Sequence, residues 1–255
     1  MISVGIDVGS ITTKAAVVKD GKLIWDKIMT TGYNAKAAGK KIFDEIIAEL
    51  DIDRSSIKGI ISTGYGRNSL KFADKAITEI TCHAVGAHYL NPKVRSVIDI
   101  GGQDSKAISI DEKGGVKDFA MNDKCAAGTG RFLEVMARAL EVDLENFGNL
   151  SITADRPSKI SSLCTVFAES EVISLISQGE KRENIIAGIH ESIAARVSAM
   201  ANRVGIKTPI MMTGGVAKNV GVLRALETKL GQPIEVSEKT QVTGAIGAAL
   251  IAQRI

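Results

Sequence analysis

The chain has 255 residues, of which 45% are apolar and 24% are charged, and these proportions are those of an ordinary globular protein. Such a length suits one large domain or two smaller lobes that bury a substantial core. The 32 basic and 29 acidic residues are dispersed and leave a net charge of only +3, and aromatic residues make up 4%. Because there is neither a basic stripe nor a stacking platform, the composition argues against nucleic acid as the main partner.

The sequence shows no sign of a targeting or membrane segment. It begins directly with a strand-like run, which argues against a signal peptide, and no apolar run approaches the length of a membrane span. We therefore expect no membrane partner and a cytoplasmic location. The cysteines Cys82, Cys125 and Cys164 form neither a CxxC pair nor a zinc-finger spacing. A disulfide is not expected in a reducing compartment, and Cys82, in an apolar helical stretch, is expected to be a buried thiol.

The first 93 residues predict a sheet with one amphipathic helix. Apolar runs separated by turns such as Asp20-Gly21 are typical of strands in hairpins, and apolar residues at helical spacing indicate a helix that packs on them. A glycine-rich turn, residues 63–67, follows the last of these strands and could lie near a ligand. The predicted strands are 2–6, 15–18, 23–28 and 57–62, and the predicted helix is 40–50.

The remainder of the chain predicts a second sheet with longer helices. The three central helices each carry apolar residues on one face, and Gly205 is the expected cap of the last of them. The C-terminal helix is rich in glycine and alanine and can therefore pack closely against the first lobe. The predicted strands are 94–98, 107–110, 210–212 and 233–236, and the predicted helices are 128–142, 165–177, 183–204 and 242–252.

Two stretches of the chain repeat one pattern between predicted strands. The first is Asp7-Val8-Gly9-Ser10-Ile11-Thr12-Thr13-Lys14-Ala15, and the second is Asp99-Ile100-Gly101-Gly102-Gln103-Asp104-Ser105-Lys106-Ala107. Each follows an apolar run, leads into another and is followed by a second glycine turn. Both copies therefore predict a strand, a glycine-rich turn with hydroxyl side chains, a strand, a turn and a strand.

The residue types of this repeat suit phosphate. Glycines allow close approach of the backbone, and consecutive N–H groups in a tight turn bind anions. Ser10, Thr12, Thr13 and Ser105 add donors, and the Asp that ends each strand could hold a magnesium ion through water. Taken alone, either stretch would be read as an ordinary β-turn. The repetition favours two turns that grip a triphosphate from both sides.

A third glycine turn follows the predicted strand 210–212. Gly214-Gly215 stand where that strand gives way to a predicted helix, and Val216 and Ala217 follow them. Glycines at such a position let a flat base and ribose lie against the backbone, and the helix N-terminus adds positive potential. A strand, two glycines and a helix are weak evidence alone, but their position after two phosphate turns strengthens the interpretation.

The order of these motifs resembles the actin, hexokinase and Hsp70 superfamily. The resemblance implies an α/β fold, a duplicated actin/Hsp70-like ATPase fold in which two lobes, each with a mixed β-sheet flanked by helices, hinge around ATP and magnesium. Lobe I would comprise residues 1–93, with the C-terminal helix 241–255 packing back on it. Lobe II would comprise residues 94–240, including a region at 120–180 that a minimal nucleotide fold does not need.

A narrower resemblance rests on the stretches around two cysteines. Residues 121–133 (MNDKCAAGTGRFL) and 164–174 (CTVFAESEVIS) are similar to the activator components of (R)-2-hydroxyacyl-CoA dehydratases, as are Thr63–Ser69 and Cys82–Ala84. The resemblance covers essentially the whole chain. It implies a homodimer that shares one [4Fe-4S] cluster held by Cys125 and Cys164 of each subunit. Leu163 departs from the family pattern, in which a hydroxyl residue is expected before the second cysteine.

Elementary chemistry agrees with this implied cluster. A cubane needs four thiolates, and two cysteines per chain supply four only in a two-fold dimer. Cys125 and Cys164 each stand just before a predicted helix. A helix start lowers the pKa of a thiol and offers N–H groups to an anionic cluster.

The resemblance also implies roles at the nucleotide. Asp7 and Asp99 would hold magnesium through water, and Glu79 would activate the hydrolytic water, although Glu79 could equally be a solvated helix-cap residue. The implied phosphate contacts are Ser10, Ile11, Thr12, Thr13, Lys14, Gly101, Gly102 and Gln103, and the implied adenosine contacts are Gly214, Gly215, Val216 and Ala217, with Gln241 near the base.

The implied activity is transfer of a low-potential electron, driven by hydrolysis of ATP to ADP. The donor would be ferredoxin or flavodoxin, and the acceptor a 2-hydroxyacyl-CoA dehydratase or a related iron–sulfur protein such as benzoyl-CoA reductase or a double-cubane protein. One alternative is a small-molecule kinase of the same superfamily, similar to pantothenate kinase, which needs no cysteines. Another is an ATP-gated binding protein without electron transfer. Colour separates the first two, because only the activator should be brown when purified without oxygen.

Overall fold

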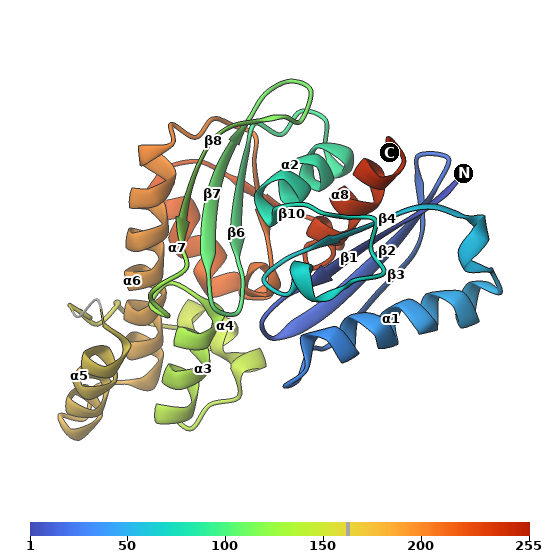
Figure 1. The fold of residues 1–255 in the computed structure, drawn as a ribbon. Helices are drawn as coiled ribbons and strands as arrows, with labels where there is room; N and C mark the ends of the chain where they lie inside the picture. Colours follow the sequence, from blue (N-terminus) through green and yellow to red (C-terminus); the bar gives the residue numbers. More distant parts are fainter. Residues whose placement is uncertain (162–163) are drawn as a thin grey trace. The chain divides into compact units, whose positions relative to one another are not determined.

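The computed structural model describes residues 1–161 and 164–255 of the chain (Figure 1). Leu163, the position that departs from the family pattern, lies outside the described residues. The chain forms two compact units. The first comprises Met1–Val97, Ile108–Asp118 and Ser237–Ile255, and the second comprises Ile98–Ala107 and Phe119–Val236.

The sheet of the first unit is mixed, with strand order β3-β2-β1-β4-β5. β1 pairs antiparallel with β2 and parallel with β4, so that Asp7 has Lys14 on one side and Thr63 on the other. β1 is buried almost throughout, as expected of a central strand, and its buried residues include the polar Ser3 and Asp7. The strands are β1 (Ile2–Val8), β2 (Thr12–Lys19), β3 (Lys22–Thr30), β4 (Ile57–Thr63) and β5 (Lys75–Ala76).

Three helices pack in this unit. Asn34 caps α1 (Ala35–Leu50), and Thr78 caps α2 (Glu79–Leu90), each by accepting a hydrogen bond from a backbone N–H of the first turn. α2 lies beside α8 (Thr243–Ala252) (Figure 1). Glycine makes this approach possible, because a Cβ at Gly247 would lie 1.8 Å from the Cys82 carbonyl oxygen.

The second sheet has strand order β10-β9-β6-β7-β8, with β9 and β10 parallel. Its strands are β6 (Ser96–Ile100), β7 (Ser105–Ile110), β8 (Val116–Asn122), β9 (Ile210–Thr213) and β10 (Ile234–Val236). The helices of the second unit are α3 (Gly130–Ala139), α4 (Leu144–Ile152), α5 (Thr165–Ser177), α6 (Arg182–Arg203) and α7 (Val220–Leu230). Short 3-10 helices span Arg54–Ser56, Arg67–Ser69 and Gly215–Lys218.

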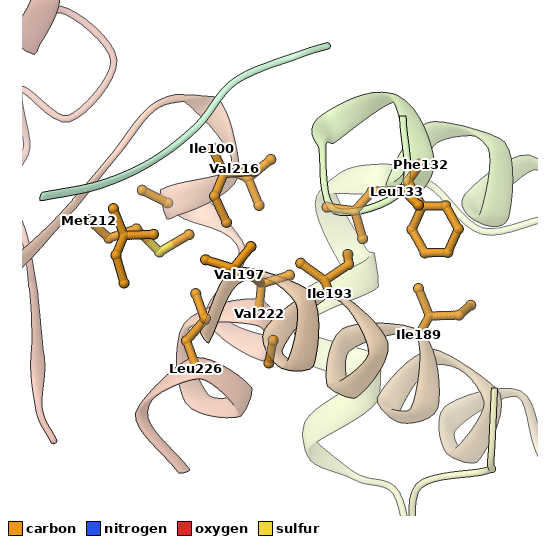
Figure 2. Packing of buried hydrophobic residues seen from close by; sticks show 14 of the residues in the cluster. Ile100, Phe132, Leu133, Ile189, Ile193, Val197, Met212, Val216, Val222 and Leu226 are labelled. Carbon is orange, nitrogen blue, oxygen red and sulfur yellow. The ribbon is translucent and has the colours of Figure 1, made fainter. Parts of the chain in front are cut away.

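The core of the second unit gathers around α6. On one stripe of α6, Ile189 and Ile193 face Phe132 and Leu133 of α3, and Val197 lies near Val216 and Val222 (Figure 2). The same cluster includes Ile100, Met212, Val216, Val222 and Leu226, and thus joins the ends of β6 and β9 to α7. The ends of β6 and β9 therefore share one packed core with the helix that follows the Cys125 stretch.

The predicted fold class is confirmed, since two mixed sheets are flanked by helices. α5 and α6 lie where the periodicity predicts them, and Gly205 adopts a φ of +62° after α6. The predicted start of α3 near residue 128 is wrong. Gly128 has a φ of +90° and Thr129 is the extended N-cap, so the helix begins at Gly130. Cys125 consequently lies in a loop rather than at a helix start.

Two further differences concern helices. α1 begins at Ala35, five residues before the predicted helix start at 40, because its first turn contains small residues that carry no apolar periodicity. α4 was not predicted at all. Among the described residues, none of the helices combines the length and apolarity that crossing a bilayer would require.

Candidate functional site

The first repeated stretch forms a tight turn between β1 and β2. The Gly9 N–H donates to the Thr12 carbonyl at 3.1 Å, which closes the turn. Thr31 then fixes the carbonyl groups, since its N–H donates to Ile11 at 2.9 Å and its hydroxyl donates to Gly9 at 2.8 Å. Ser10 is half-buried and Ile11 is exposed at the tip. The turn is therefore rigid at its base and open at its tip, as an anion-binding turn must be.

Asp7 lies at the base of this turn and is buried. Its Oδ2 atom lies 3.2 Å from Lys14 Nζ, across the β1–β2 pair. Its Oδ1 atom faces Gly64, where a Cβ would lie only 2.3 Å away and where φ is +83°. Only glycine suits that backbone conformation at such close range. Lys14 and Gly64 together hold the carboxylate in one orientation.

The second repeated stretch forms the matching turn between β6 and β7. The Gly101 N–H donates to the Asp104 carbonyl at 2.9 Å. Asp99, also buried, accepts from Thr213 Oγ1 at 2.9 Å and lies 3.1 Å from Lys106 Nζ. Lys106 also lies 2.8 Å from Asp104 Oδ2. A buried ammonium thus bridges two carboxylates.

The two turns share more than the sequence analysis found. In each, a lysine seven residues after the aspartate pairs with it. In each, a Thr-Gly pair stands at the end of the neighbouring strand. The glycine of this pair has a positive φ and lies against the strand that carries the aspartate. A Cβ at Gly214, for example, would lie 2.3 Å from the Ile100 carbonyl oxygen. Sequence reasoning quoted these residues but missed the ion pairs of Lys106 with Asp99 and Asp104, and missed that each Thr-Gly pair touches an aspartate-bearing strand. The equal Asp–Lys spacing and the repeated dipeptide were the available signals.

The two turns differ in charge. The first carries one carboxylate and one ammonium, and a Cβ at Gly9 would lie 3.0 Å from Lys14 Nζ, so the ammonium lies over the turn. The second carries Asp99, Lys106 and Asp104, with one net negative charge. The second turn is therefore more negatively charged than the first, which is neutral in its Asp–Lys pair.

Glu79 is the first residue of α2 and is only 14% exposed. Its Oε2 atom lies 3.1 Å from Arg67 Nη1, and the same nitrogen donates to the Gly64 carbonyl at 3.1 Å. Glu79 thus stands in the first turn of α2, next to the N-cap Thr78, and its carboxylate is ion-paired and mostly shielded from solvent. Arg67 links Glu79 to the glycine that touches Asp7.

Cys82 is fully buried in α2, as predicted. Burial raises the pKa of its thiol to about 12. The side chain therefore stays a neutral thiol at physiological pH, and a neutral thiol is a poor metal ligand.

The third glycine turn lies at the end of β9. Gly214, with a φ of +87°, precedes the 3-10 helix Gly215–Lys218, in which Val216 and Ala217 are buried. α7 follows this short helix. The helix predicted to start after the two glycines therefore begins as a 3-10 helix and not as an α-helix. Gln241 is half-buried in the turn before α8.

The candidate site residues are divided between the two compact units. The first unit contains Asp7, Ser10, Ile11, Thr12, Thr13, Lys14, Glu79 and Gln241, and the second contains Asp99, Gly101, Gly102, Gln103, Gly214, Gly215, Val216, Ala217, Cys125 and Cys164.

Both candidate cluster ligands belong to the second unit. Cys164 is exposed and is the N-cap residue of α5, as predicted. Cys125 is half-buried in the loop before α3, and its carbonyl accepts from Asn122 Nδ2 at 2.9 Å. Neither forms a disulfide. Within residues 1–161 and 164–255, no three His, Cys, Asp or Glu side chains gather into a metal-binding group.

Thiols at or near the protein surface fit an iron–sulfur cluster in donor chemistry. Cys125 and Cys164 supply two of the four thiolates that a cubane needs. One chain therefore offers an incomplete set.

Comparisons with known proteins agree with this chemistry. The sequence model of the BadF/BadG/BcrA/BcrD ATPase family matches residues 4–252. The activator of lactoyl-CoA dehydratase from Anaerotignum propionicum is 49% identical over 253 residues, which are 99% of this chain and 97% of that protein.

Two solved structures are similar over nearly the full length. The crystal structure of (R)-2-hydroxyglutaryl-CoA dehydratase component A from Acidaminococcus fermentans has a TM-score of 0.95 and 46% identity, covering 100% of this chain and 98% of that one. The activator of 2-hydroxyisocaproyl-CoA dehydratase from Clostridium difficile, solved with bound ADPNP, has a TM-score of 0.92 and 43% identity, covering 99% and 94%.

Proposed function

Because the chain belongs to the BadF/BadG/BcrA/BcrD ATPase family, we propose that it uses ATP hydrolysis to drive a low-potential electron into a partner iron–sulfur enzyme. The observation that carries this proposal is the presence of Cys125 and Cys164 in the same compact unit as the second turn. A small-molecule kinase would need the turns but not the cysteines. The names of the relatives, activators of hydroxyacyl-CoA dehydratases, support the same choice.

In this proposal the two turns bind the phosphates. Ser10, Ile11, Thr12, Thr13 and Lys14 contact them from the first turn, and Gly101, Gly102 and Gln103 from the second. Gly214, Gly215, Val216 and Ala217 contact the adenosine, and Gln241 lies near the base. The support is the geometry of each turn, in which side chains or glycines fix the carbonyl groups and leave the tip open.

Asp7 and Asp99 fit a magnesium ion held through water. Each carboxylate already faces a lysine, so a hydrated ion that contacts them through its water shell suits them better than a fully dehydrated one. When bound, the ion neutralises charge on the transferred phosphoryl group. Glu79 then activates the attacking water, and Arg67 fixes the orientation of its carboxylate.

Cys125 and Cys164 would hold one [4Fe-4S] cluster per homodimer, with two ligands from each subunit. When bound, the cluster supplies a one-electron carrier. The dimer is supported by α5, where the residues after Cys164 expose a large apolar surface, with Val166 65% and Phe167 66% exposed. A reducing cytoplasm would keep both thiols available for iron. The electron donor would be ferredoxin or flavodoxin, and the acceptor a 2-hydroxyacyl-CoA dehydratase or a related iron–sulfur protein.

Iron analysis of cysteine variants tests this proposal. Protein purified without oxygen should be brown and contain about four irons per dimer. Cys125→Ala and Cys164→Ala should each abolish iron binding, whereas Cys82→Ser should not, because that thiol is buried in α2. Colourless wild-type protein, or loss of iron in Cys82→Ser alone, would overturn the assignment and favour the kinase.

A further inference from the structure

The loop that carries Cys125 joins β8 to α3 and is held by its own hydrogen bonds. Asn122 Nδ2 donates to the carbonyl groups of Cys125 at 2.9 Å and Ala127 at 3.2 Å. The Thr129 hydroxyl and N–H both donate to the Ala126 carbonyl, at 2.5 and 3.0 Å. One amide side chain therefore spans the cysteine and the residue two positions after it. These hydrogen bonds hold the loop from Asn122 to Gly130 in one conformation.

This loop is also attached to the second turn. The Gly130 N–H donates to the Gly101 carbonyl at 2.9 Å, and the Arg131 N–H donates to the Gly102 carbonyl at 2.8 Å. The N-terminal N–H groups of α3 are thus satisfied by the turn itself rather than by a side-chain cap. A Cβ at Gly130 would lie 3.2 Å from the Gly101 carbonyl oxygen, so a side chain there would press the two apart.

Cys164 has a different attachment. It caps α5, and the Ala168 N–H donates to its carbonyl at 2.9 Å, a bond within that helix. Ala168 and Val172 of α5 pack into the core cluster. The hydrogen bonds described for Cys164 do not include one to the second turn.

We propose that Asn122 is the positioning residue for Cys125, and that it makes Cys125, rather than Cys164, the cysteine whose position follows the nucleotide at the second turn. A phosphate that reorients the peptide groups of Gly101 and Gly102 moves the acceptors of Gly130 and Arg131. Asn122 transmits that movement because it joins Cys125 to Ala127, three residues before Gly130. The inference rests on the proposed function, since it requires a nucleotide at this turn.

Thiol modification of the full-length, iron-free protein tests the inference. The alkylation rates of Cys125 and Cys164 are measured by mass spectrometry with ADP and with a non-hydrolysable ATP analogue, each with magnesium. Cys125 should differ by about fivefold or more between the two states, the lower range of typical coupling, while Cys164 changes little. Nucleotide binding is confirmed in the same samples by calorimetry.

Asn122→Asp provides the decisive variant. It has the same shape but replaces the donating amide with a carboxylate that repels both carbonyl groups. We expect Cys125 to react faster and equally with either nucleotide, while the nucleotide affinity is retained. Asn149→Asp, the same chemical change at an exposed position of α4, is the matched control and should behave like the wild type. Asn122→Ser, which keeps one donor, should retain part of the difference and replaces Asn122→Asp if that variant does not fold.

The outcomes separate the inference from the proposed function. Equal Cys125 rates in both states with nucleotide bound, or an equal response of Cys164, would overturn the role of this loop. An unchanged nucleotide difference in Asn122→Asp would overturn the role of Asn122. Absence of nucleotide binding, or of iron in the protein as purified, would instead overturn the proposed function.

Discussion

Asp7 and Asp99 are buried carboxylates, and a buried charge is costly unless it is paired. Each is paired with a lysine that the hairpin places opposite or beside it. Lys106 also pairs with Asp104, whereas the side chain of Lys14 has Asp7 as its one ion-pair partner among the described residues. The same motif therefore has two electrostatic forms in one chain.

Replacing either aspartate with asparagine should abolish magnesium-dependent ATP hydrolysis while the fold persists. Asp99→Asn leaves Lys106 paired with Asp104, and Asp7→Asn leaves Lys14 partly exposed to water. Neither change therefore leaves a buried charge without a partner or solvent. We expect the turnover to fall by about 100-fold or more, as when one electrostatic group is removed from an active site. Steady-state phosphate release at varied magnesium checks this, with iron content as the control for folding. Undiminished turnover in both variants would contradict the two-carboxylate arrangement.

His190, on α6, is buried, and neither ring nitrogen has a hydrogen-bond partner among the described residues. Its ring meets Phe147 edge-on, with centroids 5.4 Å apart. Burial lowers the pKa of the imidazole to about 3. The folded protein therefore keeps a neutral ring where the unfolded chain, with an ordinary pKa of 6.5, takes up a proton.

This difference predicts acid sensitivity. The contribution of the neutral His190 ring to the free energy of unfolding is fully present above about pH 6.5. It is lost as the pH falls towards about 3, by up to about 1.4 kcal/mol per pH unit. His190→Gln should flatten this part of the dependence, because glutamine takes up no proton. Urea unfolding at pH 7, 5.5 and 4.5 measures it, with His88→Gln, at a half-buried histidine, as the matched control. An equally steep loss in His190→Gln would show that other groups dominate.

Among the elements, α5 is unusual in carrying apolar residues on two faces. Ala168 and Val172 pack into the core, while Val166, Phe167, Ile173 and Ile176 are exposed. A helix that is apolar on both sides is expected to be covered on both sides in the assembled molecule. Because this surface begins two residues after Cys164, covering it with a second copy would bring the cysteines of both chains together.

Ile173→Asp should therefore weaken the dimer and remove iron at the same time. The substitution lies nine residues from Cys164, so loss of iron would follow from dissociation and not from local damage. Ile173 is exposed in one chain and would be buried in both copies of the proposed dimer, so placing aspartate there should weaken association by about 100-fold or more. Analytical ultracentrifugation and iron analysis measure the two effects. Ile24→Asp, at an exposed isoleucine of β3 in the first unit, is the control, and a fully dimeric, iron-loaded Ile173→Asp would contradict this use of α5.

At the scale of the whole molecule, the second unit contains both proposed cluster ligands and the second turn, where we propose that phosphate binds. Gly101 and Gly102 belong to the second turn and also accept the first N–H groups of α3, which follows the Cys125 loop. Exposure and hydrogen bonding around sulfur control the reduction potential of a cluster. A nucleotide that shifts this turn should change both properties, within the limit set by its differential affinity for the two forms.

Chelators should accordingly remove iron at different rates from the ADP-bound protein and from protein with a non-hydrolysable ATP analogue. The redox spectrum should differ in the same two states. Iron release is followed by the absorbance of the chelator complex, with nucleotide binding verified separately. Identical rates and identical potentials with nucleotide bound would leave this coupling without support.

Local sequence was sufficient wherever the structure depends on neighbours in the chain. Residues 165–177 and 183–204 carry enough apolar periodicity to predict α5 and α6, and the glycine turns within the repeat predict the two hairpins. The repeated Asp–Gly stretches also indicate phosphate chemistry, because hydroxyls and glycines lie next to the aspartate in the sequence itself. α4 escaped prediction because Gly148 and two asparagines weaken its helical pattern.

The partners of the site residues were decided by the tertiary structure. Thr213 bonds to Asp99 across 114 positions, and Arg67 reaches Glu79 around a glycine turn, and no local pattern encodes either contact. The start of α3 depends in the same way on Gly101 and Gly102, which take up its first N–H groups. Periodicity reports which face of an element is buried. It does not report which distant group will satisfy a buried carboxylate or a helix end, because that choice depends on how separate strands come to lie side by side.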